Sequence, residues 1–262
     1  MNLTDSDVLK FLHGTPILLE DICAIYPATL GEIADIGYDN FQQYLGTIIT
    51  KKPEHLFIKG EKELTALLNK FTDFQYLLFL AMMEKEVQET LKDSFRFFCH
   101  EEVILSFEME QIIIGPIEEQ HILTEEKFYE LQHIIRCMYF LEEVGNDSLI
   151  IAKDEDPRVR AIKEKIARDN KKREELRRKK ARTEEGGDMK FSDLVASMPL
   201  NDCGLNIGNI WDITYYAFHD QLKRMGWRDQ FNINHRAALA GAKLKDGQLK
   251  HWIRSINNSN ND

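Results

Sequence analysis

The sequence predicts a mainly α protein of the α+β class. Its parts are an α-helical N-terminal body with a small β-hairpin element, a long charged helical spacer and a small helical C-terminal unit. Three observations support this prediction. The 262 residues include only 6 Pro and 14 Gly, fewer than a turn-dense all-β protein uses. Apolar residues recur mostly at helical spacing, and alternation is confined to a stretch near 98–123. A highly charged run with little apolar face separates the two ends of the chain.

Composition and cysteine usage indicate a globular cytoplasmic protein. Hydrophobic residues make up 43% of the chain and charged residues 30%, which excludes wholesale disorder and fibrous repeats. The four cysteines (residues 23, 99, 137 and 203) include no CxxC pair, so we expect reduced thiols and neither a disulfide framework nor a zinc site. The acidic N-terminus is unlike a signal peptide, and the longest strongly apolar run, 74–83, is about half of a bilayer span. We expect no membrane association.

Charge is distributed unevenly along the chain. Residues 1–150 contain 11 Lys and Arg against 27 Asp and Glu, a net charge of −16. Residues 151–186 contain 14 against 9, a net charge of +5, and residues 187–262 contain 9 against 8, a net charge of +1. An acidic body of this size repels a phosphate backbone, so general nucleic-acid binding by residues 1–150 is disfavoured.

Residues 1–150 begin with an extended segment and a capped helix. Residues 17–26, bounded by prolines, are a short apolar run typical of a strand or a buried extended segment. Thr29, with Glu32 three positions later, is a capping box. Apolar residues follow at roughly helical spacing as far as Ile48, which predicts a helix over this stretch.

The remainder of the body predicts three helices around a small β element. Helices are expected over 61–70 and over 73–92, and the second is apolar nearly all round, as expected of a central core helix. Residues 98–123 change to short β-rich runs joined by turn residues, which predicts a hairpin or small sheet. Thr124 then caps a helix that continues towards the Gly-Asn pair at 145–146.

Residues 151–187 predict a charged helical spacer. Acids precede bases by four residues six times in this stretch, and on a helix such pairs are neighbours in the favourable orientation. Pro157 suits the first helical turn and the Gly pair 186–187 suits the end, giving a mostly solvated helix of about 26 residues and about 40 Å. Two alternatives remain open, a disordered tether and an arm for nucleic acid or an acidic partner. That arm would use the basic residues Arg173, Arg177, Arg178, Lys179 and Lys180.

Residues 188–256 predict a small helical unit with an aromatic face, and residues 257–262 an Asn-rich disordered tail. A short helix is expected near 191–200, a second one beginning near Trp211 with Asp212 in its first turn, and a third containing the small residues 237–242. The aromatic stripe is either internal core or a protein-interaction surface, because aromatic residues dominate binding hot spots. The candidate interaction residues are Trp211, Tyr215, Phe218, Leu222, Met225, Trp227 and Trp252.

Motifs of the common enzyme classes are absent from the sequence. No phosphate-binding glycine loop and no G-x-S-x-G nucleophile elbow occurs, and the eight histidines never fall four residues apart. We therefore expect a protein without catalytic activity, metal site or cofactor.

Two stretches resemble a known family. The C-terminal residues 210–256 (IWDITYYAFHDQLKRMGW…LKHWIRSI) and the segment IYPATLGEIADIGYDNFQQYL at 25–45 are similar to tail assembly chaperones encoded by long-tailed phages of Gram-positive bacteria. The resemblance implies a chaperone in the host cytoplasm that binds the tape measure protein and helps tail-tube subunits assemble, with self-association as a further expectation. It also implies that the chain could be the long product of a translational frameshift.

Two other functions remain open at the level of sequence. One is a structural tail component retained in the virion, and the other is a nucleic-acid-binding regulatory protein acting through the basic spacer.

Overall fold

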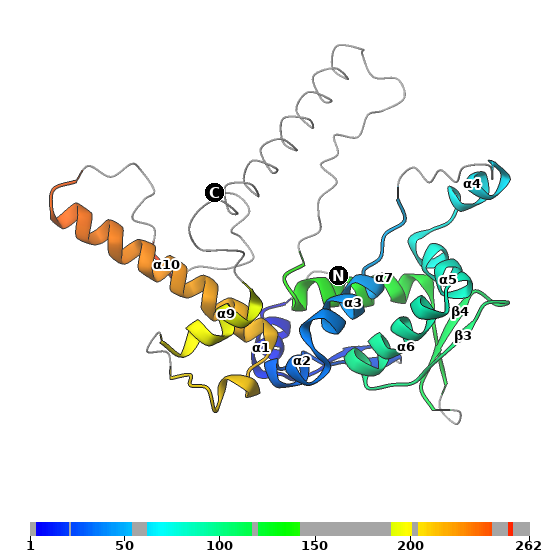
Figure 1. The fold of residues 1–262 in the computed structure, drawn as a ribbon, viewed down its shortest axis with the longest axis horizontal. Coiled ribbons are helices and arrows are strands. Elements are labelled where there is room, and N and C mark those ends of the chain that lie inside the picture. Colours follow the sequence, from blue (N-terminus) through cyan, green and yellow to red (C-terminus); the bar gives the residue numbers. More distant parts are fainter. Residues whose placement is uncertain are drawn as a thin grey trace, which may run out of the picture. The chain divides into compact units, whose positions relative to one another are not determined.

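The computed structural model describes residues 4–20, 22–53, 62–116, 120–141, 190–200, 204–242 and 251–253 (Figure 1). The chain divides into a main unit, Met1–Tyr139 with Trp211–Asp262, and a second unit, Phe140–Ile210. The expected spacer at 151–187 and the tail at 257–262 lie outside the described residues.

The main unit contains most of the helices and all the strands that are described. In chain order they are α1 (Asp5–His13), β1 (Ile17–Leu19), β2 (Cys23–Ile25), α2 (Leu30–Ile36), α3 (Tyr38–Ile48), α4 (Lys62–Leu68), α5 (Asp73–Met83), α6 (Lys85–Cys99), β3 (Val103–Ser106), β4 (Gln111–Ile114), β5 (His121–Leu123), α7 (Glu125–Met138) and α10 (Tyr215–Leu239). This content confirms the mainly α, α+β prediction.

Threonine residues begin five of these helices. Each lies in extended conformation just before α1, α2, α5, α7 or α10, and its hydroxyl accepts a hydrogen bond from the backbone N–H of the third residue of the helix. Such a cap contributes about 1 kcal/mol. The predicted capping box of Thr29 and Glu32 is confirmed, since Glu32 also accepts the Thr29 backbone N–H at 2.7 Å.

Two helices that the spacing predicts as continuous are each broken once. Gly37, with φ of +85°, ends α2 and begins α3, a conformation that residues with a Cβ adopt only under strain. Glu84, in extended conformation, separates α5 from α6, so the helix predicted over 73–92 is two helices that pack on each other. Helical periodicity continues across both breaks, which hid them from the sequence analysis.

The β structure consists of two small antiparallel sheets. β1 and β2 form a hairpin in which Ile17 lies opposite Ile25. β3, β4 and β5 form a three-stranded meander in that order, with Ile112 opposite both Leu105 and Leu123. The predicted small β element near 98–123 is therefore present, with one strand more than a hairpin has. Ile112, Ile114 and Leu123 turn one face of the meander into the core.

The core of the main unit contains a cluster of aromatic rings from three helices (α3, α6 and α10) and from Tyr139, which follows α7. The Phe41 ring centroid lies 5.4 Å from those of Tyr139 and Tyr215 and 6.3 Å from that of Phe98. Such tilted pairs contribute about 0.5–1.5 kcal/mol beyond the burial of their area. Tyr215 belongs to α10, so a residue from the C-terminal part of the chain completes the core of the N-terminal body.

The C-terminal region therefore differs from the separate unit predicted for 188–256. Residues from Trp211 onward belong to the main unit, and α10 is one helix of 25 residues where two were expected. The helix begins at its cap Thr214, so Asp212 lies before it, in the 3-10 turn η2 (Ile210–Asp212), and not in its first turn. The C-terminal region joins the main unit because the backbone at the start of α10 forms hydrogen bonds with the N-terminal body, as described below.

The second unit is described over two short stretches. α9 (Phe191–Ser197) continues into the 3-10 turn η1 (Met198–Leu200), which agrees with the short helix expected there. Residues 204–209 form a turn in which Asn206 Oδ1 accepts the backbone N–H groups of Gly208 and Asn209. Across the described part of the chain, no helix combines the length and the apolar character needed to cross a bilayer.

Candidate protein-interaction surfaces

The first turn of α10 is anchored to the N-terminal body by backbone hydrogen bonds. Leu30 N–H donates to the Ile213 carbonyl at 3.0 Å, and Tyr215 N–H donates to the Ala28 carbonyl at 2.8 Å. Thr214 adds a side-chain bond, since its hydroxyl donates to the Phe11 carbonyl at 2.8 Å while accepting from the third residue inward. We call residues 213–218 the α10 root. These bonds join segments about 200 residues apart in the sequence.

Two of the candidate interaction residues lie inside this root. Tyr215 is 8% exposed and Phe218 is fully buried. Both are core residues, so the prediction that they line an interaction surface is wrong for this structure. The sequence analysis left core and surface open as alternatives, because the same helical spacing results when a stripe packs against its own chain.

An ion pair lies on α10 just after the root. Asp220 is buried, and its carboxylate accepts two hydrogen bonds from the Arg224 guanidinium, at 2.6 and 3.1 Å. These bonds raise the pKa of Arg224. Burial raises the pKa of the neighbouring Tyr216 to about 12. A buried carboxylate in this position is tolerated because its charge is balanced one helical turn away.

The remaining candidate residues lie at or near the surface. Leu222, Met225 and Trp227 are half-buried along α10, with the Lys223 ammonium 5.5 Å above the Trp227 ring. Trp211 is exposed, and the half-buried Trp252 stacks with His251 at 5.8 Å between ring centroids. Further along α10, Ile233 and Leu239 are exposed. The sequence analysis did not select these two residues, since they lie outside the aromatic stripe.

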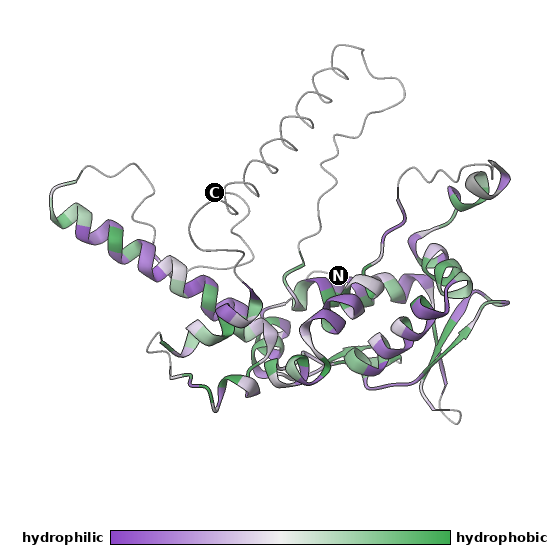
Figure 2. Cartoon of the chain, viewed as in Figure 1, coloured by the Kyte–Doolittle hydropathy of each residue, from purple (hydrophilic) through white to green (hydrophobic). Residues whose placement is uncertain are grey.

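A second apolar surface lies on α5 and beside the β3–β4 turn. A cavity of about 90 Å³ is lined by the residues that we call the α5 groove: Phe71, Gln75, Leu78, Phe79, Met82, Phe107 and Glu110. Its aromatic floor includes an edge-to-face pair of Phe71 and Phe79, with ring centroids 6.0 Å apart. Gln75 Nε2 donates to Glu110 Oε2 at 3.0 Å, which joins the helix to the turn. Figure 2 shows α5 as one of the most hydrophobic helices of the chain.

Three methionines leave much of their surface in solvent at or near this groove. Met82 is 52% exposed, Met83 is 64% exposed and Met109 is 68% exposed. The sequence predicts α5 as a core helix because it is apolar nearly all round. The structure buries its Phe74, Leu77, Leu78 and Ala81 and leaves the methionine end open. An exposed apolar cluster of this kind is typical of a protein-interaction site.

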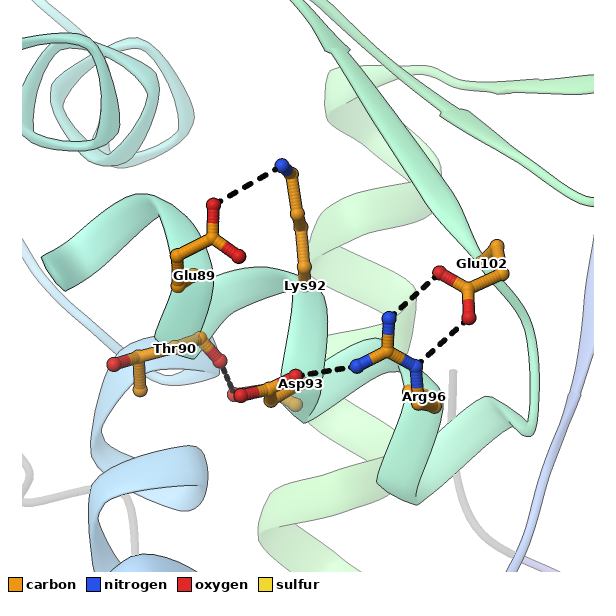
Figure 3. A network of polar contacts seen from close by, with 7 residues as sticks. Glu89, Thr90, Lys92, Asp93, Arg96 and Glu102 are labelled. Carbon is orange, nitrogen blue, oxygen red and sulfur yellow. Dashed lines mark hydrogen bonds and ion pairs between the residues drawn. The ribbon is translucent and has the colours of Figure 1, made fainter. Parts of the chain in front are cut away.

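The exposed face of the neighbouring helix α6 is charged. Arg96 donates two hydrogen bonds of 2.8 Å to Glu102 and one of 2.5 Å to Asp93, and Lys92 pairs with Glu89 at 3.3 Å (Figure 3). The bonds from Arg96 lower the pKa of Glu102. Four exposed acidic residues lie close to the groove in the sequence: Glu84 and Glu86 directly follow α5, and Glu108 and Glu110 belong to the β3–β4 turn, where Glu110 also lines the cavity.

The predicted basic site of the spacer cannot be placed in the structure. The basic spacer residues at 173 and 177–180 lie outside the described residues. Among the residues that are described, no group of three or more His, Cys, Asp or Glu side chains is positioned to hold a metal ion.

Comparison with known protein families shows a similarity in the C-terminal region. Residues 178–257 match the family model described as the YomV second domain, a region that contains α9, α10 and all seven aromatic and aliphatic candidate residues. The match concerns this region alone and names no tail assembly chaperone family. It covers less than half of the chain. No curated protein and no solved structure matches the chain significantly.

Proposed function

We propose that the chain is a non-enzymatic phage tail assembly chaperone that binds apolar segments of the tape measure protein and helps tail-tube subunits assemble around it. The observation that carries this proposal is the solvent-open α5 groove, which contains the exposed Met82, with the exposed Met83 and Met109 close to it in the sequence. A chaperone needs an apolar surface that remains uncovered in its free state, and this groove is such a surface within the described residues.

The residue types of the groove suit a client of variable sequence. Methionine side chains are unbranched and polarizable, so they adapt to differently shaped apolar partners. Phe71 and Phe79 supply rigid contact area beneath them. The best-fitting occupant is therefore an apolar helical segment, with basic residues at its edges to meet Glu108 and Glu110.

The charge of the body suits the same role. Residues 1–150 carry a net charge of −16, which opposes aggregation of a complex whose client is hydrophobic. The resemblance of residues 25–45 and 210–256 to tail assembly chaperones supports the identity of the client. The phage-type domain match at 178–257 supports the phage context.

Co-expression with a tape measure protein tests the proposal. We expect the unmodified chain to keep the tape measure protein in the soluble fraction. The double substitution Met82→Glu and Met83→Glu should abolish this effect, because it places charge where the apolar segment binds. Leu18→Glu is the control, since Leu18 on β1 is more exposed than Met82 and Met83 and lies outside the groove. The measurement is the soluble share of the tape measure protein.

Two results would contradict the proposal. One is a tape measure protein whose solubility does not depend on the chain, and the other is equal loss with Leu18→Glu and with the groove variant. Removal of all residues from 187 onward is not a suitable test, because it also removes the α10 root from the core. Mass spectrometry of purified particles separates a chaperone, absent from the virion, from a structural tail component.

A further inference from the structure

Cys23 and Cys99 are 76 positions apart in the sequence, yet their Sγ atoms lie 3.5 Å apart. Cys23 is the first residue of β2 and is half-buried, whereas Cys99 is the last residue of α6 and is 2% exposed. Both are free thiols. The sequence analysis expected four reduced thiols and did not pair these two, because no local motif brings them together.

Contacts that do not involve sulfur hold the two cysteines in place. Tyr26, which follows β2, donates its backbone N–H to the Phe98 carbonyl at 2.8 Å. Its ring stacks on that of His100, with centroids 4.0 Å apart and planes 17° apart. Phe98 and His100, which make these contacts, directly precede and follow Cys99 in the sequence. The proximity of the two sulfur atoms therefore follows from the packing of β2 on the end of α6.

We propose that Cys23 and Cys99 form an oxidisable dithiol that closes into an intramolecular disulfide by exchange with a low-molecular-weight disulfide such as oxidised glutathione. Bond formation requires the sulfur atoms to approach by about 1.5 Å. The proposal concerns the main unit alone and does not depend on the proposed chaperone function.

The burial of the two thiols sets the order of the steps. Cys23 is the more accessible, so its thiolate attacks one sulfur of the small disulfide, breaks the S–S bond and releases the first small thiolate, which takes up a proton. The Cys99 thiol loses its proton to solvent or to the released thiolate, and its sulfur then attacks that of Cys23. This second step displaces the other small thiol. Two protein thiols are oxidised and one small disulfide is reduced to two thiols.

The pKa of Cys99 is raised by its hydrogen bond with Cys23 and by burial. A raised pKa makes Cys99 a poor first nucleophile. This agrees with its role as the second, resolving thiol.

A Cys23–Cys99 disulfide would hold β2, and β2 immediately precedes the segment that binds the α10 root. The disulfide closes a long loop between β2 and α6, and closing a long loop restricts the unfolded chain strongly. The segment after β2 carries Ala28 and Leu30, whose backbone groups bind the root of α10. The oxidised chain should therefore unfold at a temperature higher by roughly 5–15 °C.

The test uses the full chain with Cys137→Ser and Cys203→Ser, so that Cys23 and Cys99 are the remaining thiols. After incubation with oxidised glutathione we expect an intact mass lower by two hydrogen atoms, no free thiol in the denatured chain, a Cys23–Cys99 linked peptide in the digest, and the higher unfolding temperature. Dithiothreitol should reverse all four. The control variant with Cys23→Ser added should show none of them.

Three results would overturn the proposal. The first is two free thiols after incubation, and the second is a stable glutathione adduct on Cys23 without closure. The third concerns the unsubstituted chain: after oxidation and digestion, Cys23 or Cys99 is found linked to Cys137 or Cys203 and not to its proposed partner. This last experiment also decides the question if the two serine substitutions impair folding.

Discussion

At the scale of single residues, Tyr139 shows how one side chain joins several elements. Its hydroxyl accepts the Ala28 N–H at 3.0 Å and donates to the Tyr26 carbonyl at 3.4 Å. Its ring lies 5.4 Å from Phe41 and 5.6 Å from Tyr215. Complete burial raises the pKa of Tyr139, which keeps the hydroxyl protonated and able to donate. Removal of this hydroxyl would leave the Ala28 N–H without its partner.

His219 gives a pH-dependent prediction at the same scale. Burial lowers its pKa to about 4, below the value near 6.5 of an unfolded chain. The folded state therefore favours the neutral ring. This contribution is complete above about pH 6.5 and is lost as the pH falls towards 4. Since the ring keeps some solvent contact, we expect a loss of about 1–2 kcal/mol.

The measurement is urea unfolding of the chain and of the variant His219→Gln at several values from pH 7 to pH 4.5. The unmodified chain should lose about 1–2 kcal/mol more than the variant over this interval. Parallel pH profiles for the two proteins would show that His219 does not titrate with unfolding.

At the scale of elements, the breaks between consecutive helices determine the direction in which each helix runs. Sequence periodicity and the caps at Thr29 and Thr124 located the helices of the body from residue 30 onward, but not α1. Periodicity did not locate the breaks at Gly37 and Glu84, because the apolar positions stay in phase across them. The break at Glu84 separates the apolar helix α5 from the amphipathic helix α6. It thereby leaves Met82 and Met83 exposed at a helix end.

Substitution by alanine should have opposite effects on stability at Gly37, which precedes α3, and at Gly46, which lies inside it. Gly37 has φ of +85°, so Gly37→Ala should destabilise the chain by about 1–2 kcal/mol through backbone strain, although no atom lies within 4 Å of the added Cβ. Gly46 lies inside α3 with equally open space, so Gly46→Ala should stabilise by about 0.5–1 kcal/mol. Chemical denaturation measures both effects. Changes of the same sign would contradict this account of the joint.

At the scale of the whole molecule, the two ends of the chain share one core. The root of α10 supplies Tyr215 to the aromatic cluster of the body and buries Phe218 completely. Two backbone hydrogen bonds and one from the Thr214 hydroxyl hold the root there. The YomV second domain match at 178–257 therefore includes residues that complete the N-terminal body. The boundary that charge and composition suggest at 187 does not coincide with the boundary of the compact unit.

Phe218→Ala tests this shared core. Removal of the fully buried ring should cost about 3–5 kcal/mol and weaken the whole main unit, including β1–β2 and α3. Leu239→Ser is the control, since Leu239 is exposed near the end of the same helix, and we expect a change below about 0.5 kcal/mol. Hydrogen exchange of the amides in α3 would report the coupling. Unchanged protection there with Phe218→Ala would argue for an independent C-terminal unit.

The sequence by itself determined the class of the fold, the caps at Thr29 and Thr124, most of the helices and the β element near 98–123, because these depend on residue types a few positions apart. Only the tertiary structure decided where α10 packs, which aromatic residues are core, that α5 ends in open methionines and that Cys23 meets Cys99. These features depend on which segments far apart in the chain lie against one another. Local periodicity describes the apolar face of a helix and carries no information about what covers that face.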